Sequence, residues 1–217
     1  MDAWGNRTAR HDVNISKESI QKVMNDFKGI IKQIPPMYSA VKIRGKKLYE
    51  LARKGIEIDR KPRQVEIKRL KMIYADHRKA IFDVECSKGT YIRTLCSDIG
   101  KKLGCGAHMS FLVRTAAGVF KIKDAITFES FREDFNKGNN HKMLESVDKP
   151  LTGIPKLKLG SSELRKLSNG VSIKIKTDHS SDVLLIYDEE GTLSAVAECH
   201  TDKEGDTLLK PRKVFCS

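Results

Sequence analysis

The chain has 217 residues, of which 39% are hydrophobic and 32% charged, and its formal net charge is +13. This composition predicts a soluble globular protein of one large domain, or of one domain and a smaller companion. A membrane span is excluded because no apolar run approaches the roughly 18 residues that it needs. The excess of positive charge favours a polyanionic partner, above all nucleic acid, over a merely basic globular protein.

The five cysteines are odd in number, and no two of them are separated by only two residues. This spacing predicts neither a zinc site nor a disulfide framework, so we expect reduced thiols. The N-terminus lacks the apolar region of a signal peptide, which favours a cytoplasmic protein. A thiol or metal enzyme is therefore a weak hypothesis. Cys96 falls at an apolar position of a predicted helix, where a place in the core is the simpler interpretation.

The first predicted helix begins after Ser16, a favourable capping residue, and ends at Gly29. The pair Pro35-Pro36 then excludes a helix and predicts an extended or turned path. A short strand over residues 40–43 follows. After it comes a short helix that ends at Gly55.

Residues 56–86 alternate between apolar and polar side chains, as in RQVEIKRLKMIYAD and AIFDVEC. The alternation predicts two antiparallel strands joined by a turn over ADHRK. An amphipathic helix is predicted between Gly89 and Gly104, since its apolar residues recur three or four positions apart. MSFLVRTAAGVFKI is predicted to be one strand bent near Gly118, and KDAITFESFREDF is predicted to be a helix.

Composition changes at KGNNHKMLESVDKPLTGIPK, which is rich in Gly, Asn, Pro and Lys, and we place a domain boundary there. Residues 1–148 form the larger predicted domain and residues 149–217 the smaller one. Within the smaller domain VSIKIK, DVLLIYDEEGTLSAVAECH and TLLKPRKVF predict short strands, with turns at Glu190-Gly191 and Glu204-Gly205. We therefore expect a small all-β module at the C-terminus.

The segment CSKGTYIRTLCSDIG runs from a predicted strand through a Gly-containing turn into a helix. Free N–H groups at such a helix start bind anions, and Lys88 and Arg93 would add positive charge beside them. Arg93 lies in the first helical turn, where the helix dipole disfavours a cation unless an anion is bound. The alternative, which local physics alone slightly favours, makes Thr90 a helix cap, Tyr91 a packing residue and Arg93 a solvated or paired charge.

Two further segments carry unusual combinations of residues. QIPPMYSAVKIRGKK joins a stiff turn to Tyr38, Lys42 and further cations, a pattern suited to stacking on RNA bases and to phosphate contacts. The alternative is a tight surface loop with solvated lysines. In HMSFLVRTAAGVF, Arg114 is flanked by apolar residues, so it must find a carboxylate or reach solvent.

The chain resembles the TruB-type tRNA pseudouridine synthases, which modify a T-arm uridine, in QIPPMYSAVKIRGKKLYELARKGIEI and CSKGTYIRTLCSDIGKKLGCGAHMSFLVRTAAGVF. The C-terminal part resembles the small PUA-like β domain at the C-terminus of these enzymes, in LRKLSNG, LLIYDEEGTLSAVAE and LLKPRKVF. The resemblance implies an α+β fold, in which a mixed, largely antiparallel sheet has flanking helices, and a tRNA partner without metal or cofactor. It implies RNA-binding roles for Tyr38, Lys42, Lys88 and Arg93, and it makes Arg114 the partner of a nucleophilic Asp.

The sequence departs from the family in one respect. The family's nucleophile lies in a Gly-x-Leu-Asp motif, which is absent from these 217 residues, and MDAWGN resembles a region downstream of that motif. Asp12, Asp59 and Asp98 do not occur in a matching context. We therefore expect this chain alone to be inactive, Arg114 to be exposed or paired elsewhere, and uncovered surface to favour self-association. The alternative is a non-catalytic RNA-binding protein derived from the same fold.

Overall fold

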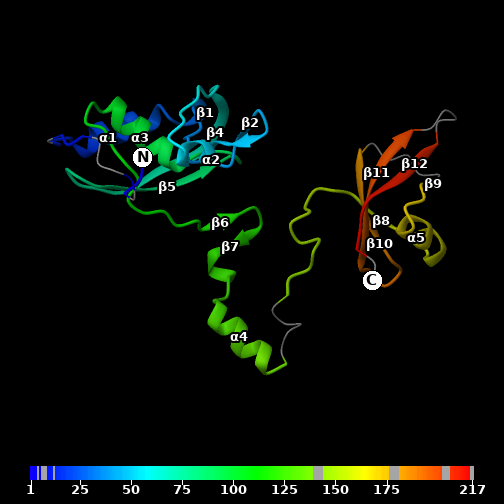
Figure 1. The fold of residues 1–217 in the computed structure, drawn as a ribbon. Helices are drawn as coiled ribbons and strands as arrows, with labels where there is room; N and C mark the ends of the chain where they lie inside the picture. Colours follow the sequence, from blue (N-terminus) through cyan, green and yellow to red (C-terminus); the bar gives the residue numbers. More distant parts are fainter. Residues whose placement is uncertain are drawn as a thin grey trace. The chain divides into compact units, whose positions relative to one another are not determined.

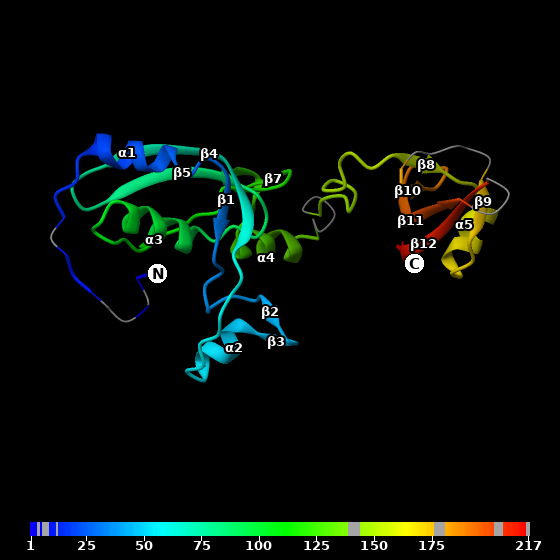
Figure 2. The same ribbon diagram turned by 90° about the horizontal axis from the view of Figure 1, so that it is seen from above.

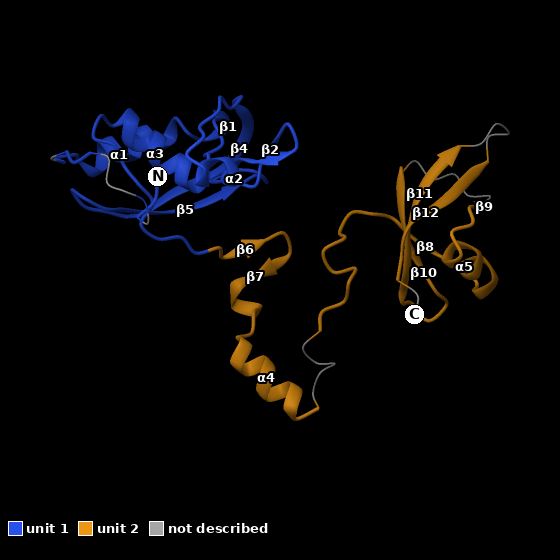
Figure 3. Cartoon of the chain, in the orientation of Figure 1, with its two compact units in different colours: residues 1–113 blue, residues 114–217 orange. Residues whose placement is uncertain are grey.

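In a computed structural model, the chain forms two compact units, residues 1–113 and residues 114–217 (Figure 3). The structure describes residues 1–3, 5, 9–11, 13–138, 144–175, 181–201 and 206–215. The fold class is α+β, with largely antiparallel sheets and short helices, as predicted. The domain boundary between residues 148 and 149 stays a prediction.

The first unit is organised by a three-stranded antiparallel sheet in the order β1-β4-β5 (Figure 1). Strands β4 (Arg63–Ala75) and β5 (Ala80–Cys86) form the predicted hairpin, which confirms the interpretation of the alternating pattern. Strand β1 (Gly29–Gln33) was not predicted, because five residues after a helix stop carry too little periodicity to indicate a strand.

Helices α1 (Lys17–Asn25) and α3 (Ile92–Lys102) contact each other and bury their apolar faces against the sheet. The Ser16 hydroxyl accepts a hydrogen bond from the backbone N–H of Ser19 at 3.2 Å, so the predicted cap of α1 is confirmed. The buried residues of this core are Ile20, Met24, Ile67, Leu70, Leu95 and Ile99.

The end of α3 is packed closely against the loop that follows it. A Cβ on Gly100 would lie 2.2 Å from the backbone nitrogen of Ala107, so a side chain does not fit there. The Gly100 carbonyl also accepts a hydrogen bond from the Gly106 N–H at 2.9 Å. Gly100 therefore lets residues 104–107 turn back over the helix.

A small substructure follows β1 and projects from one end of the sheet (Figure 2). It contains β2 (Lys42–Ile43), β3 (Lys46–Lys47) and α2 (Leu48–Arg53). Arg44 and Gly45, at φ 49° and 81°, form the two-residue turn between the strands. Type I′ hairpins require positive φ at both positions, which is unusual for a residue with a side chain such as Arg44.

The single strand predicted for MSFLVRTAAGVFKI is wrong. Residues 110–115 have no regular structure, and β6 (Ala116–Ala117) pairs with β7 (Phe120–Lys121) across a tight turn. Gly118 adopts φ 59°, and a glycine in this conformation reverses the chain instead of bending one continuous strand. The apolar residues 111–113 are exposed, so their run does not mark a core strand.

The segment that follows is partly helical. A 3₁₀ turn, η1 (Ile122–Asp124), precedes α4 (Phe128–Asn136), so the predicted helix begins later than KDAITFESFREDF suggests. The Thr127 hydroxyl caps it by accepting a hydrogen bond from the Ser130 N–H at 3.1 Å. Helix α4 leaves its aromatic residues on the surface, with Phe128 90% exposed.

The C-terminal part contains a five-stranded sheet in the order β8-β10-β11-β12-β9. The predicted strands are confirmed as β9 (Ile173–Ile175), β10 (Val183–Tyr187), β11 (Leu193–Thr201) and β12 (Thr207–Val214). Strand β8 (Lys156–Lys158) and helix α5 (Ser161–Ser168) were not predicted. The turn at Glu190-Gly191 connects β10 and β11, whereas Glu204-Gly205 lies outside the described residues.

One carboxylate ties the chain before β8 to this sheet. Asp148 accepts hydrogen bonds from the hydroxyls of Ser146 and Tyr187 and from the Lys156 ammonium. These donors, led by Ser146 and then Tyr187, lower the Asp148 pKa to about 2. The cluster therefore favours an ionised Asp148 at neutral pH.

Among the described residues, no helix combines the length and the apolar character that crossing a bilayer requires.

Candidate functional site

The loop between β1 and β2 presents Tyr38 to solvent. Pro35 and Pro36 are buried, whereas the Tyr38 side chain is 59% exposed. Proline fixes φ, so the buried pair limits how far the backbone of this loop can move. The loop therefore combines a stiff base with an accessible aromatic ring.

Gln33 fastens the start of this loop to helix α3. Its side-chain Nε2 donates to the Tyr91 carbonyl at 3.1 Å, and its Oε1 accepts from the Tyr91 N–H at 2.8 Å. Gln33 is only 2% exposed, so its amide replaces water as the partner of Tyr91. One N–H group at the start of α3 is thus already satisfied within the protein.

Arg93 joins the N-terminus to the Tyr38 loop. Its Nη1 lies 3.0 Å from Asp2 Oδ2, and its Nη2 donates to the Tyr38 carbonyl at 2.8 Å. The Asp2 carboxylate supplies the negative charge that a cation in the first turn of a helix requires. Thr90 does not cap α3, because its hydroxyl donates to the Ser87 carbonyl and Tyr91 occupies the N-cap position.

Asp2 is held in place by backbone pairing. The Ala3 N–H donates to the Met109 carbonyl at 3.0 Å, and the Met109 N–H donates to the Met1 carbonyl at 3.0 Å. This short parallel pairing sets Asp2 beside the start of α3. The N-terminus therefore contributes to the local structure of the site.

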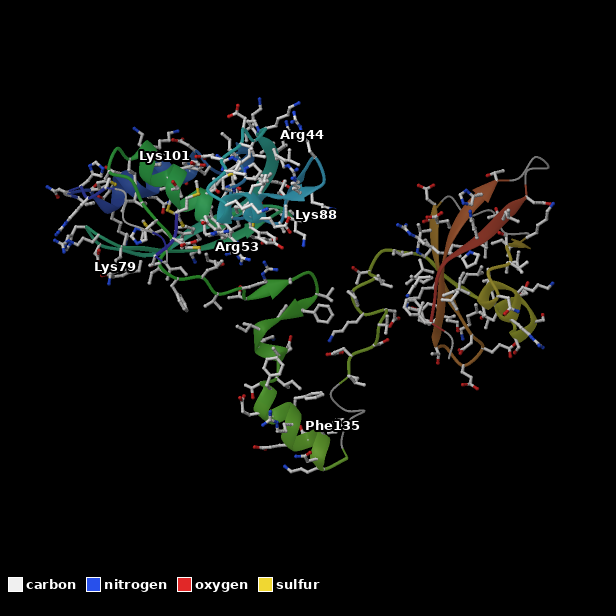
Figure 4. All side chains as sticks on the ribbon, in the orientation of Figure 1. Arg44, Arg53, Lys79, Lys88, Lys101 and Phe135 are labelled. Carbon is white, nitrogen blue, oxygen red and sulfur yellow. The ribbon has the colours of Figure 1, made fainter. Side chains whose placement is uncertain are left out.

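Basic side chains surround the projecting substructure. Five exposed cations come from the β2–β3 hairpin, from the end of α2 and from the turn after β5. They are Lys42, Arg44 and Lys46 of the hairpin, Arg53 of α2 and Lys88 of the turn. Figure 4 shows Arg44, Arg53 and Lys88 toward the same end of the first unit, whereas Lys79 and Lys101 lie toward the other end. Within the described ranges these five exposed cations form no ion pair, so they can contact an anionic ligand without first breaking one.

Arg114 lies in the second unit, at the start of the segment that leads to β6. It is exposed, which confirms the expectation that it reaches solvent. The predicted site residues Tyr38 and Arg93 are joined by a hydrogen bond, and Lys42 follows in the same loop.

The structure adds three residues that the sequence did not single out: Asp2, Gln33 and Arg60. Gln33 follows the apolar residues Ile30 and Ile31, and a polar residue at a strand end was the available signal for it. Asp2 carries no local signal, because its partner Arg93 is distant in sequence. Arg60 lies three residues after its partner Glu57, but its bond to the Pro35 carbonyl has no local signal either.

The described residues show no group of three or more His, Cys, Asp or Glu side chains that could hold a metal ion. Burial raises the Cys96 pKa to about 11, which keeps this thiol protonated and unreactive at neutral pH. Neither observation favours thiol or metal chemistry at this site.

Comparison with known proteins assigns the chain to a family. The N-terminal domain of the TruB family pseudouridylate synthases matches residues 1–92, and the C-terminal domain of tRNA pseudouridylate synthase B matches residues 93–154. The chain is 42% identical to tRNA pseudouridine synthase B of Syntrophomonas wolfei and 38% identical to that of Bacillus subtilis. These alignments cover 99% and 96% of this chain and 72% and 69% of the two relatives.

Solved structures show the same fold. A Cbf5-Nop10-Gar1 complex contains a chain that matches with a TM-score of 0.69 at 23% identity, and an H/ACA RNP bound to a substrate RNA matches at 0.68 and 21%. This chain spans 64% of each of those chains, and the matches cover 95% and 96% of its own length. By sequence identity, matched domains and fold, this chain belongs to the TruB family of pseudouridine synthases.

Proposed function

We propose that this chain forms the substrate-holding part of an enzyme that isomerises a T-arm uridine of tRNA to pseudouridine. The observation that carries the proposal is the exposed Tyr38 on a stiff loop, next to a cationic hairpin, in a member of this family. Aromatic rings stack on unpaired bases, and cations beside them neutralise phosphates. The target uridine must leave the T-loop stack to be reached.

Each predicted site residue has a role in this proposal. Tyr38 stacks on a base, and Lys42 and Lys88 contact phosphates. Arg93 supports the loop, because its guanidinium is already bonded to Asp2 and to the Tyr38 carbonyl. Binding therefore weakens as salt rises, and replacing Lys42 or Lys88 reduces the slope of that dependence by about one counterion each.

The chemistry requires a carboxylate nucleophile. During isomerisation the glycosidic bond from C1′ to N1 breaks, the base turns over, a bond from C1′ to C5 forms, the C5 proton leaves and N1 takes up a proton. The 217 residues contain no Gly-x-Leu-Asp motif, so we propose that this chain alone does not catalyse the reaction. Arg114 would pair with the nucleophilic Asp of that motif and keep it ionised.

A second candidate is a non-catalytic tRNA-binding protein with the same fold, which the absence of the motif favours. Both candidates bind RNA in a salt-dependent way. They differ in whether activity appears when a segment with the Gly-x-Leu-Asp motif is joined to the chain. In either case we propose the cytoplasm as the compartment, because tRNA is the partner.

Tritium release from a T-arm hairpin RNA labelled at C5 of uridine tests the enzyme candidate against the non-catalytic candidate. The enzyme proposal predicts no release with the 217-residue chain, retained hairpin binding, and release after the family's N-terminal segment is fused to it. Binding without release in the fused chain would favour the non-catalytic protein. Release by the 217-residue chain itself would mean that another carboxylate acts as nucleophile, and loss of hairpin binding would contradict both candidates.

The exposed aromatic residues of helix α4 are a candidate surface for the expected self-association of the isolated chain. Phe128, Phe131 and Phe135 recur at helical spacing and are all exposed, and the rings of Phe131 and Phe135 stack with centroids 6.2 Å apart. We propose that two copies cover these rings mutually. Sedimentation velocity should show a concentration-dependent dimer that Phe128→Ser weakens, whereas a strictly monomeric chain would contradict this.

A further inference from the structure

The loop that presents Tyr38 is bonded at several successive backbone groups. Gln33 binds Tyr91 where the loop begins, and the Tyr49 N–H donates to the Ser39 carbonyl at 3.1 Å where it turns back. Between these points the Tyr38 carbonyl accepts the hydrogen bond from Arg93. The loop therefore depends on more than its two prolines for its shape.

Arg60, which comes after the loop in the sequence, also binds the loop backbone. It follows α2, and its Nη1 donates to the Pro35 carbonyl at 3.4 Å, at the long end of hydrogen-bond distances. Its Nη2 lies 2.9 Å from Glu57 Oε1. The carbonyls of Pro35 and Tyr38, three residues apart, are thus each bonded to an arginine that is oriented by a carboxylate.

Burial distinguishes Arg60 from the cations that surround it. Its side chain is 18% exposed, whereas that of its partner Glu57 is 77% exposed. Within the part of the chain that the structure describes, Arg60 Nε is buried and has no hydrogen-bond partner. Burying a guanidinium with an unused donor is unfavourable, and such a group in a folded protein calls for a reason.

From this geometry we infer that Arg60 and Arg93 form a two-arginine clamp on the Pro35 and Tyr38 carbonyls, which holds the Tyr38 ring in its RNA-binding orientation. Arg60 is a positioning residue, since its largely buried guanidinium contacts a backbone carbonyl and a carboxylate. The inference rests on the proposed function for the part that concerns RNA. Holding the ring in place before binding removes an ordering cost from the binding step.

The planar guanidinium is suited to this role. It directs separate N–H groups at Glu57 and at the Pro35 carbonyl, which the single ammonium of lysine does not reproduce with the same geometry. Arg60→Lys should therefore behave like Arg60→Gln, although it keeps the charge. A residue that acts by charge alone would be rescued by lysine.

Binding of a fluorescent T-arm hairpin RNA to the 217-residue chain, measured by anisotropy over a range of salt, tests the clamp. Arg60→Gln should weaken binding about fivefold or more, while the salt slope stays that of the unchanged chain. The exposed Arg78→Gln, which removes the same charge from the β4–β5 turn, should weaken binding about twofold or less.

A double-mutant cycle with Tyr38→Ala separates positioning from direct contact. If Arg60 acts through the Tyr38 ring, Arg60→Gln has little further effect once the ring is gone. Full additivity of the two changes, together with a salt slope reduced by about one, would show that Arg60 contacts phosphate and would overturn the inference.

Hydrogen exchange of the chain without RNA tests the clamp separately from the function. The Ser39 N–H, bonded to the Met37 carbonyl at 2.9 Å, and the Tyr49 N–H should exchange about tenfold faster in Arg60→Gln. Unchanged exchange at both amides would refute the clamp. If the unchanged chain does not bind the hairpin, the proposed function fails, and these two amides still decide whether the clamp exists.

A milder variant covers the case in which Arg60→Gln does not fold. Glu57→Gln removes the carboxylate that orients Arg60, and at this exposed position the substitution should change the stability of the fold by less than about 0.5 kcal/mol. It should accelerate exchange of the same two amides by about two- to threefold. Exchange at the rate of the unchanged chain would then contradict the clamp.

Discussion

Replacing Gln33 by leucine should destabilise the first unit by removing its link between β1 and α3. Among the described residues, the Tyr91 N–H has Gln33 Oε1 as its hydrogen-bond partner, at 2.8 Å, and a partly buried donor left unsatisfied costs about 1–3 kcal/mol. The Tyr91 carbonyl keeps its bond from the Leu95 N–H at 3.0 Å, so losing the Gln33 donor costs only about 0.5–1.5 kcal/mol more. We expect a total of about 1.5–4.5 kcal/mol.

The measurement must report the first unit alone, because two compact units need not unfold together. Hydrogen exchange of the Ile67 and Leu95 amides in increasing urea does so, since both residues lie in the core of this unit. Gln64→Leu, the same change at an exposed position of β4, is the matched control and should shift stability by less than about 0.5 kcal/mol. Equal effects of the two substitutions would refute this account of Gln33.

Three further predictions concern packing and ionisation. Gly100→Ala should destabilise the first unit by about 1–3 kcal/mol or more, because its Cβ would overlap Ala107, and urea unfolding would show no change if the loop could move away freely. Asp148→Asn should destabilise the second unit at neutral pH. Since the folded pKa of Asp148 is depressed to about 2 from 3.8, this difference should persist above about pH 4 and shrink as the pH falls toward 2. A pH-independent difference in thermal unfolding would contradict that assignment. Cys96, with its pKa raised to about 11, should be alkylated by iodoacetamide at pH 8 far more slowly in the folded than in the unfolded chain, and equal rates by mass spectrometry would show that it is not buried.

The elements with strong periodicity were predictable. The β4–β5 hairpin, α1 and α3 each carry apolar residues at the spacing that their structure requires, and local capping by Ser16 agrees with the pattern. The strand predicted around Gly118 failed for a physical reason. A run of apolar residues normally marks a buried strand, but residues 111–113 are exposed, and the backbone conformation of Gly118 reveals the chain reversal.

The site was predictable in its residue types and only partly in its connections. Tyr38 and Lys42 could be singled out because a stiff aromatic and basic loop has a local signature. The two interpretations of Arg93 could not be separated without knowing that Asp2, far away in the sequence, lies beside it. Gln33 bonds to the Tyr91 backbone and Arg60 to the Pro35 carbonyl, and because every residue possesses backbone groups, no pattern of side chains identifies these two partners.

The pairing of Met1–Ala3 with Met109 has a consequence for the order of events during synthesis. A ribosome that adds about 5–20 residues per second reaches residue 109 about 5–22 s after residue 1. Before Met109 is synthesised, Asp2 has no backbone partner that aligns it. Its ion pair with Arg93 therefore cannot form in the native geometry, even if α3 has already packed on the β4–β5 hairpin. The ion pair that orients Arg93 toward the Tyr38 loop should therefore be among the last contacts to form in the nascent first unit.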